Sequence, residues 1–327
     1  MADAQKNYSI GGYLGLQLPL HDEDVMQGMI KTNSARSAIK LVLAAVKAKK
    51  IWLPYYICES VINAVRDIGV QIGFYNVNSD FSVDPSLTLS EDEFILVAEY
   101  FGIFKNHIND TLHRFGHKRT IVDCSQAYFS KPTAALATVY SPRKFFGLPD
   151  GGLIYTCNEN IQQPRARDST SQSRMSHLLK RLIDEPEAGY EDYLEAEHSI
   201  AKLPVQGMSY LTERLLKSVD SRQVKQIRTK NAQHVHKYLS EYNQLDFVVD
   251  QDTSPLCYPF LPNVKVSSRL DLIKKRVFVP TYWPEVLNRV TKNSYEWNVV
   301  TNCLFLPCDQ RYSEGEMDRL IGLLAID

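Results

Sequence analysis

The stretch Val139–Thr156, VYSPRKFFGLPDGGLIYT, decides how this chain is interpreted, because it places one lysine between a strand-like run and a Pro-Asp-Gly-Gly turn. Lys144 follows the β-prone run Ala137–Tyr140 and precedes Phe145 and Phe146, so its surroundings are mostly apolar and aromatic. A desolvated lysine loses its proton readily, and the neutral amine is a nucleophile that can form a Schiff base with a carbonyl. The alternative is a solvated lysine at a strand end, as most lysines are.

The chain before this stretch alternates short apolar runs with helical patterns, which is typical of a parallel α/β sheet. Asn33 and Ser34 form a good N-cap for a helix that continues through SARSAIKLVLAAVKAKK. We therefore predict an α/β fold with a mostly parallel, doubly wound sheet, whose ligands bind beyond the carboxyl ends of the strands. The expected strands are Ile51–Leu53, Gln71–Val77, Phe94–Tyr100, Thr120–Asp123 and Gly151–Tyr155, and the expected helices are Glu59–Ile68 and His107–Phe115.

The second half of the chain predicts a long excursion and then a smaller domain. Residues 158–199 are first polar and basic and then acidic, which indicates an excursion with some helix, either mobile or packed on a partner subunit. A long helix over Ser221–Tyr242 can bridge two domains. We expect a large domain over residues 1–218 and a small α+β domain over 219–327, which the helix Ser313–Leu324 closes.

Composition excludes several classes of protein. The 327 residues carry a net charge of −1, which argues against a nucleic-acid or anionic-membrane surface. No window is apolar enough to span a membrane and the start resembles no signal peptide, so a cytoplasmic location is expected. The six cysteines form no C-x-x-C pair, and the eight histidines show no ligand spacing with an acidic partner, so no disulfide framework and no metal site are expected.

Two further signals accompany Lys144. The helix start at Thr32–Ile39 presents unpaired N–H groups and small side chains, which suits a phosphate, although a well-capped helix would look the same. Asp123 ends an apolar strand, where an ionised carboxylate needs a cationic or hydrogen-bonding partner such as a protonated pyridine nitrogen. An ordinary strand-end aspartate that caps the next turn is the alternative. A phosphate site, a pyridinium partner and a Schiff-base lysine are what pyridoxal 5′-phosphate (PLP) requires.

The order of these signals resembles the fold-type-I PLP-dependent enzymes, and most closely the DegT/DnrJ-type aminotransferases that act on nucleotide-linked keto sugars. The most specific features are Asp123, Gln126, Lys144 and the pair Gly151-Gly152 in register. The matching stretches are SARSAI for the phosphate-binding helix start, LPYYICESVINAV for the segment beneath the cofactor ring, VDCSQA, SPRKFFGLPDGG, and the closing LFLPCDQRYSEGEMDRLIGLL.

The resemblance implies a role for each matching residue. Lys144 would carry the cofactor as a Schiff base and transfer protons, and Asp123 would keep the pyridine nitrogen protonated. Gln126 would hydrogen-bond the phenolic oxygen. The phosphate would bind at the helix-start amides, and the family's ring-stacking aromatic residue would be one of two neighbouring tyrosines. The remaining cofactor-binding candidates are Ser34, Ala35 and Arg36 at the helix start, Ser141 for a further hydroxyl, and Tyr55 or Tyr56 for the stacking ring.

The sequence departs from the family pattern near the lysine and in the small domain. Ser141 lies closer to Lys144 than the serine that precedes the lysine in the family, and Arg36 stands where many relatives have a small or neutral residue. Arg143, beside the lysine, could lower its pKa by repulsion or could be an ordinary surface arginine. The arginines that could bind a substrate carboxylate are Arg269, Arg276 and Arg289, and any of them could equally be solvated.

The resemblance implies an aminotransferase with an amino-acid donor, glutamate or glutamine, and a nucleotide-linked keto sugar of a glycan pathway as acceptor. It also implies a homodimer with shared active sites, in which residues 161–199 contribute to the neighbour's sugar pocket. One alternative is another PLP enzyme, such as a lyase or a desulfurase, for which Cys58 or Cys124 would supply the thiol. A non-catalytic binding or regulatory protein is a second alternative. A nicotinamide enzyme is disfavoured because no G-x-G-x-x-G follows a strand.

Overall fold

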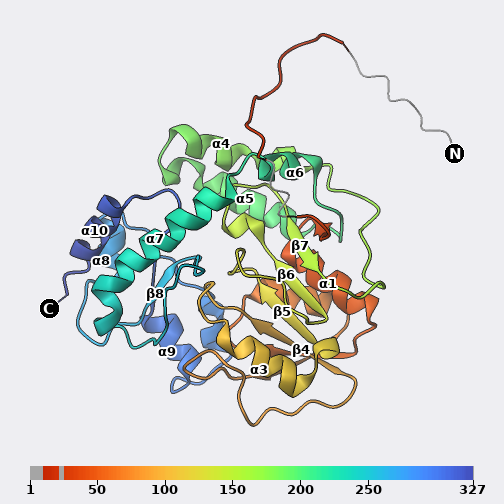
Figure 1. Ribbon diagram of the computed structural model, residues 1–327, viewed down its shortest axis with the longest axis horizontal. Helices are drawn as coiled ribbons and strands as arrows, with labels where there is room; N and C mark the ends of the chain where they lie inside the picture. The colour runs from red at the N-terminus through yellow and green to blue at the C-terminus, as the bar shows by residue number, and fades with distance from the viewer. Residues whose placement is uncertain (1–9, 22–25, 327) are drawn as a thin grey trace.

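A computed structural model describes residues 10–21 and 26–326. Its centre is a seven-stranded sheet with the order β1-β7-β6-β5-β4-β2-β3 (Figure 1). Neighbours from β3 to β6 pair in parallel, whereas β7 pairs antiparallel with both β6 and β1. The strands are β1 (Ile30–Thr32), β2 (Lys50–Pro54), β3 (Gln71–Tyr75), β4 (Glu93–Ala98), β5 (Thr120–Cys124), β6 (Ala137–Tyr140) and β7 (Gly152–Tyr155).

Helices cover both faces of this sheet, because the buried strands carry apolar side chains in both directions. Leu96 of β4 packs in the same core as the helices α1 (Ala35–Ala45) and α2 (Glu59–Asp67). Its neighbours Ile95 and Val97 face the opposite core, which includes α3 (Asn106–Phe115). The predicted doubly wound, mostly parallel sheet is confirmed.

The C-terminal part of the chain builds its own core on the long helix α7 (Ser221–Leu239), which ends three residues before the expected Tyr242 in a short 3₁₀ turn. The apolar runs Tyr258–Leu261 and Cys303–Leu306 contribute an antiparallel pair of strands. The apolar runs Phe247–Val249 and Val277–Val279 stay irregular and bury Val249 and Val279. The remaining elements are the strands β8 (Tyr258–Phe260) and β9 (Leu304–Leu306) and the helices α8 (Arg269–Lys274) and α10 (Glu314–Leu323).

One C-terminal segment packs on the core of the first half. The 3₁₀ turn Pro284–Asn288 and helix α9 (Tyr295–Asn302) contribute Val286 and Val299 to the hydrophobic cluster that contains β4 and α3 residues. Glu296 is 1% exposed, and its Oε1 accepts the N–H of Val77 at 2.9 Å. The domain boundary between residues 218 and 219 stays a prediction. This segment lies after that boundary in the sequence but packs on the part of the chain before it.

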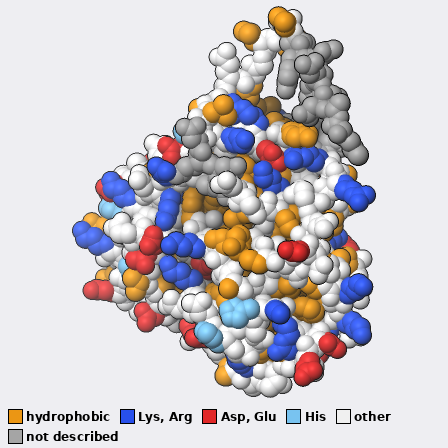
Figure 2. Space-filling view, turned by 45° about the vertical axis from the view of Figure 1, so that its right-hand side comes forward, with side chains coloured by type: hydrophobic (Ala, Val, Ile, Leu, Met, Phe, Trp, Pro, Cys, Tyr) orange, Lys and Arg blue, Asp and Glu red, His pale blue; other side chains and the backbone are white. Residues whose placement is uncertain are grey.

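The excursion contains two helices, α4 (Ser176–Ile183) and α5 (Tyr190–Ala201), the second of which ends two residues beyond it. Helix α6 (Tyr210–Leu216) follows, and α4 and α6 lie at the top of Figure 1. Residues 10–15 extend away from the body and leave Ile10, Tyr13 and Leu14 exposed, whereas the Leu18 and Pro19 carbonyls accept hydrogen bonds from Arg214 of α6. Scattered charged side chains surround a central group of apolar ones on the face in Figure 2. No helix in the described part of the chain is long and apolar enough to cross a membrane.

Candidate active site

A cavity of about 490 Å³ lies at the carboxyl edge of the parallel strands, where such folds bind ligands. Asp123 at the end of β5, Lys144 in the turn after β6 and Ser34 after β1 all line it. Ala35, Arg36 and Ser141 line it as well. The structure therefore brings six of the nine predicted site residues to one cavity, although they come from three separate strand ends.

The helix start in this cavity presents free donors. The Ser34 Oγ accepts the N–H of Ser37 at 3.1 Å, whereas the N–H groups of Ala35 and Arg36 have no acceptor within the helix. The backbone of Gly152 lies against this start so closely that a Cβ there would be 2.3 Å from the Ser34 carbonyl carbon. A glycine is thus required to bring the lysine turn against the helix start.

Arg36 adds a cation to the same end of the cavity. Its side chain is half-buried, and among the described residues it makes no ion pair. Burial lowers the pKa of its guanidinium, Glu197 opposes this shift, and Arg143 adds to it. A half-buried guanidinium without a bonded carboxylate favours an anion in the cavity.

Asp123 is 7% exposed and is held by its own turn. Its Oδ1 accepts the N–H of Ser125 at 2.8 Å, and the strand around it pairs with Ala98 on one side and Val139 on the other. Among the described residues no cation forms an ion pair with Asp123. A ligand N–H can therefore be the partner of its second oxygen.

Lys144 is exposed, whereas the sequence predicted an apolar and aromatic environment for it. The reason is that Phe145 and Phe146 turn into the core, where they contact the ring of Tyr128 at centroid distances of 5.7 and 5.0 Å. The lysine side chain remains outside and lines two cavities. Its Nζ lies 5.9 Å from the ring centroid of Trp283.

The other three predicted residues do not line the cavity. Tyr55 stacks on Phe74, and Tyr56 is fully buried in an aromatic cluster, so the prediction that one of them faces the cofactor ring lacks support from their positions. Gln126 is 4% exposed, and its Oε1 accepts the N–H of Phe101 at 3.2 Å. Its Nε2 is buried without a hydrogen-bond partner in the described part of the chain.

The excursion supplies cavity residues that the sequence did not reveal. His177, Tyr193 and Glu197 line the cavity of their own chain, where Glu197 forms an ion pair with Arg143. Burial lowers the pKa of His177, and its Nδ1 has no partner. The acidic composition of the segment was visible in the sequence, but its contact with the lysine turn was not. Further lining residues that were not singled out are Ile57, Ser60, Ser125, Leu148 and Trp283, whereas Cys58, the thiol of the lyase alternative, lines the cavity as well.

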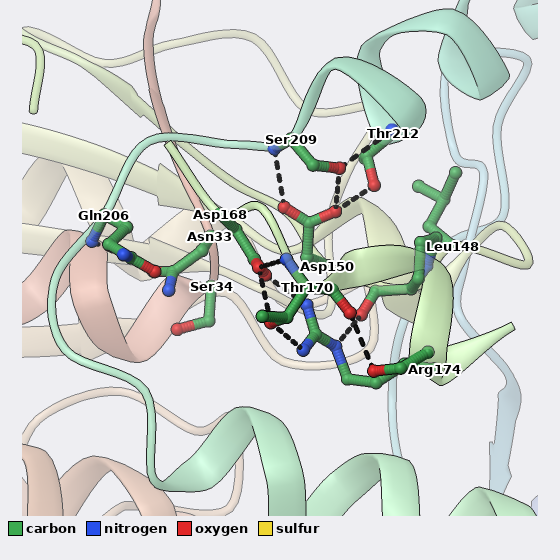
Figure 3. Close-up of polar contacts among 12 residues, drawn as sticks. Asn33, Ser34, Leu148, Asp150, Asp168, Thr170, Arg174, Gln206, Ser209 and Thr212 are labelled. Carbon is green, nitrogen blue, oxygen red and sulfur yellow. Dashed lines mark hydrogen bonds and ion pairs between the residues drawn. The ribbon is translucent and has the colours of Figure 1, made fainter. Parts of the chain in front are cut away.

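A buried polar network holds the lysine turn, residues 144–151, through the side chain of Asp150 and the carbonyl of Pro149 (Figure 3). Asp150 accepts hydrogen bonds from the Ser209 N–H at 2.8 Å, from the Ser209 hydroxyl at 2.7 Å and from the Thr212 hydroxyl. Arg174 pairs with Asp168, both side chains being 1% exposed, and donates to the Pro149 carbonyl at 3.1 Å. These contacts fix the turn between Lys144 and β7.

The same network reaches the helix start. The Asn33 carbonyl accepts the N–H of Gly151 at 2.8 Å, and the Asn33 N–H donates to the Gln206 carbonyl at 2.8 Å. The Asn33 amide donates to the Pro204 carbonyl at 3.0 Å. The lysine turn and the predicted phosphate site therefore belong to one hydrogen-bonded unit.

Lys144 also lines a second cavity of about 990 Å³. Arg269 lines it and donates from Nε to the Val279 carbonyl at 2.7 Å. Arg276 is instead paired with Glu185 and Glu187 on the surface, and Arg289 donates to the Ile57 carbonyl. Of the three candidate arginines, Arg269 has the position for a substrate anion.

The donors and acceptors present fit PLP. The helix-start amides with Arg36 suit a phosphate, and the free oxygen of Asp123 suits a pyridinium N–H. The Nε2 of Gln126 is buried outside the cavity lining, so its contact with the phenolic oxygen stays a prediction. Lys144 supplies an accessible amine.

Neither a family model nor a curated protein matches the sequence. Solved structures do match the fold. NtdA from Bacillus subtilis with bound cofactor PMP has a TM-score of 0.62 at 18% identity, over 90% of this chain and 72% of that chain. A sugar aminotransferase from Micromonospora echinospora has a TM-score of 0.63 at 14% identity, over 90% and 86%. A DegT DnrJ EryC1 StrS aminotransferase from Brucella abortus has a TM-score of 0.58 at 13% identity, over 90% and 84%.

These similarities define the fold of this chain, which is that of the fold-type-I PLP-dependent enzymes. Within that class, the matching structures are those of DegT/DnrJ-type sugar aminotransferases, as the sequence predicted.

Proposed function

We propose that this chain is a PLP-dependent aminotransferase that moves an amino group from glutamate to the keto group of a nucleotide-linked sugar. The observation that carries the proposal is the single cavity shared by Lys144, Asp123 and the Ser34 helix start. The type of reaction and the acceptor follow from the sugar aminotransferases that share the fold.

The residues of the cavity have separate tasks in this reaction. PLP, when bound, supplies an aldehyde that condenses with amines and a ring that withdraws electrons. Lys144 provides the amine that holds the cofactor and afterwards takes and returns a proton. Asp123 accepts the N–H of the ring nitrogen and keeps it protonated. The helix start of α1 binds the phosphate through N–H groups and the positive end of its dipole.

The second cavity is the proposed acceptor site. It opens at Lys144, so a substrate there reaches the same amine, and it is lined by Arg269 together with the apolar side chains of Phe278 and Phe305. Cations beside apolar surface suit the phosphates and the base of a nucleotide.

A homodimer is part of the proposal. Apolar side chains are exposed on the extended segment 10–20 and on α4, including Leu182 at 79% and Ile183 at 85%. A second copy would cover such side chains. Light scattering of the eluting protein on a sizing column tests this, and a monomer at all concentrations would contradict it.

The lyase alternative has one observation in its favour. Cys58 lines the cavity as a half-buried thiol, 3.0 Å from the Ser60 hydroxyl, whereas Cys124 is buried against Glu99. A desulfurase would need the Cys58 thiol for its reaction. Sulfur release from L-cysteine that is lost in Cys58→Ala would support this role, and a wild type that releases none would exclude it.

The absorbance spectrum with added PLP tests the main proposal. The wild type should develop the near-visible band of a lysine-bound cofactor, and Lys144→Ala should not. Addition of L-glutamate should convert the band to the pyridoxamine form. A band that no amino donor changes would favour the lyase, and the absence of a band would favour a binding protein with this fold. Lys131→Ala, at an exposed lysine away from the cavity, is the matched control.

A further inference from the structure

Trp283 enters the cofactor cavity from the C-terminal part of the chain. It lines the 490 Å³ cavity together with Lys144 and Asp123. Of the described residues that follow Glu197 in the sequence, Trp283 alone lines this cavity. The tryptophan precedes the 3₁₀ turn Pro284–Asn288. A residue predicted to belong to the small domain therefore forms part of the site on the large one.

The backbone of Trp283 is in a conformation that a large side chain rarely adopts. Its φ of 56° and ψ of 57° lie in the left-handed region, which is unfavourable for a bulky residue. The following Pro284 restricts the backbone further. Strain of this kind persists only where surrounding contacts enforce it, and it concentrates at functional sites.

Three contacts hold the segment in place. The Glu285 carboxylate accepts the Glu59 N–H at 2.9 Å at the start of α2. Arg289 donates to the Ile57 carbonyl at 2.8 Å, and Val286 is fully buried. Both ends of the turn are thus tied to the segment that lines the cavity beside Trp283.

The indole ring is held between an aromatic cluster and the lysine. The ring of Tyr56 meets it edge-on at a centroid distance of 4.8 Å, and that of Tyr100 does so at 6.2 Å. On the cavity side, the Lys144 Nζ lies 5.9 Å from its centroid. Tyr56 therefore supports the indole and does not face the cavity itself.

The two other aromatic side chains of the cavity are less suitable for contact with a cofactor ring. Phe146 is 8% exposed and packs into the core against Tyr128. Tyr193 belongs to α5 and packs against His177 at 5.7 Å. Of these three rings in the described part of the chain, that of Trp283 is the one in cation–π contact with the Lys144 amine.

We propose that Trp283 is the aromatic wall of the cofactor pocket and packs against the pyridine ring of PLP, in place of Tyr55 or Tyr56. This inference rests on the proposed function, because it requires PLP to bind at Lys144. Aromatic rings gain from offset or edge contacts beyond the area that they bury.

The test compares PLP binding by full-length variants. Trp283→Leu keeps an apolar side chain but removes the π-face, whereas Trp283→Phe keeps a ring. Trp297→Leu is the matched control, since Trp297 is a half-buried tryptophan of α9 outside the cavity. The dissociation constant of PLP and the circular dichroism of its lysine-dependent band are measured, with thermal unfolding to check that each variant is folded.

We expect Trp283→Leu to weaken PLP binding about two- to tenfold and to change the dichroism of the band. Trp283→Phe should restore most of the affinity, and Trp297→Leu should match the wild type. Wild-type binding and dichroism in Trp283→Leu would overturn the inference. Equal losses in the Leu and Phe variants together with lower unfolding temperatures would also overturn it, because they indicate a structural role. A wild type without any lysine-dependent band would instead refute the proposed function and the inference with it.

Discussion

Asp150 should be essential for the position of the lysine turn, and the substitution Asp150→Asn tests this. The carboxylate is fully buried and accepts three hydrogen bonds from Ser209 and Thr212, at the start of α6. Burial raises its pKa, and the hydrogen bonds from Thr212 and Ser209 oppose the rise. Asparagine has nearly the same shape but replaces one acceptor oxygen by an NH₂ group.

The expected loss can be worked out from these contacts. In Asp150, one carboxylate oxygen accepts the Ser209 N–H and the other accepts the hydroxyls of Ser209 and Thr212. Asparagine has one acceptor oxygen, so its NH₂ group must face either the Ser209 N–H or the two hydroxyls. A hydrogen bond to a charged group contributes about 1.5–3 kcal/mol, and a buried donor without a partner costs about 1–3 kcal/mol. Removal of a buried charge offsets part of this loss. We therefore expect the free energy of unfolding to fall by about 2–4 kcal/mol.

Denaturant unfolding with linear extrapolation measures this change. Asp246→Asn is the control, because Asp246 is exposed and lies outside this network. Since the network connects the turn to the helix start, PLP should also bind more weakly to Asp150→Asn, while the lysine-dependent band still forms. A free energy of unfolding within about 0.5 kcal/mol of the control, the range of ordinary surface substitutions, would refute this account of the turn.

Two further predictions concern packing and pH. Gly152→Ala should destabilise the protein by about 1–3 kcal/mol and weaken PLP binding, because a Cβ would lie 2.3 Å from the Ser34 carbonyl carbon and 2.6 Å from the Ala35 nitrogen. Gly315→Ala in α10 is the control, because the nearest atom to a Cβ there is 3.8 Å away, and it should stabilise the protein by about 0.5–1 kcal/mol. Denaturant unfolding measures both changes. Equal effects of the two substitutions would contradict the close approach at Gly152. Burial lowers the pKa of His107 from 6.5 to about 4, so the unfolded chain binds a proton first as the pH falls, and about 2 kcal/mol of stability should be lost between pH 7 and pH 5. In His107→Gln this loss of stability between pH 7 and pH 5 should disappear. If the free energy of unfolding falls with pH equally in both proteins, His107 does not cause the loss.

The excursion illustrates the limit of composition as a guide to contacts. Its polar and acidic character predicted a segment that is mobile or packed on a partner subunit, and Glu197 in it binds Arg143 within the same chain. Arg276 binds Glu187 in the same way, which removes it from the candidate substrate residues. Ion pairs between distant segments depend on how the elements pack, and no local pattern encodes that packing.

The sequence by itself determined a mostly parallel sheet, the helix start at Ser34 and the strand-end positions of Asp123 and Lys144, but it predicted neither the strand β1 before Ser34 nor the antiparallel pairing of β7. These features follow from local rules: apolar runs form buried strands, a serine caps a helix, and ligand-binding residues follow the carboxyl ends of strands. Only the tertiary structure decided which aromatic side chain faces the lysine. Tyr56 directly precedes Ile57, which lines the cavity, but its own side chain is buried in the core. Trp283 lines the cavity although it lies in a distant segment of the chain. The physical reason is that the direction of a side chain at a strand end depends on the core that it joins, and that core is assembled from both halves of the chain.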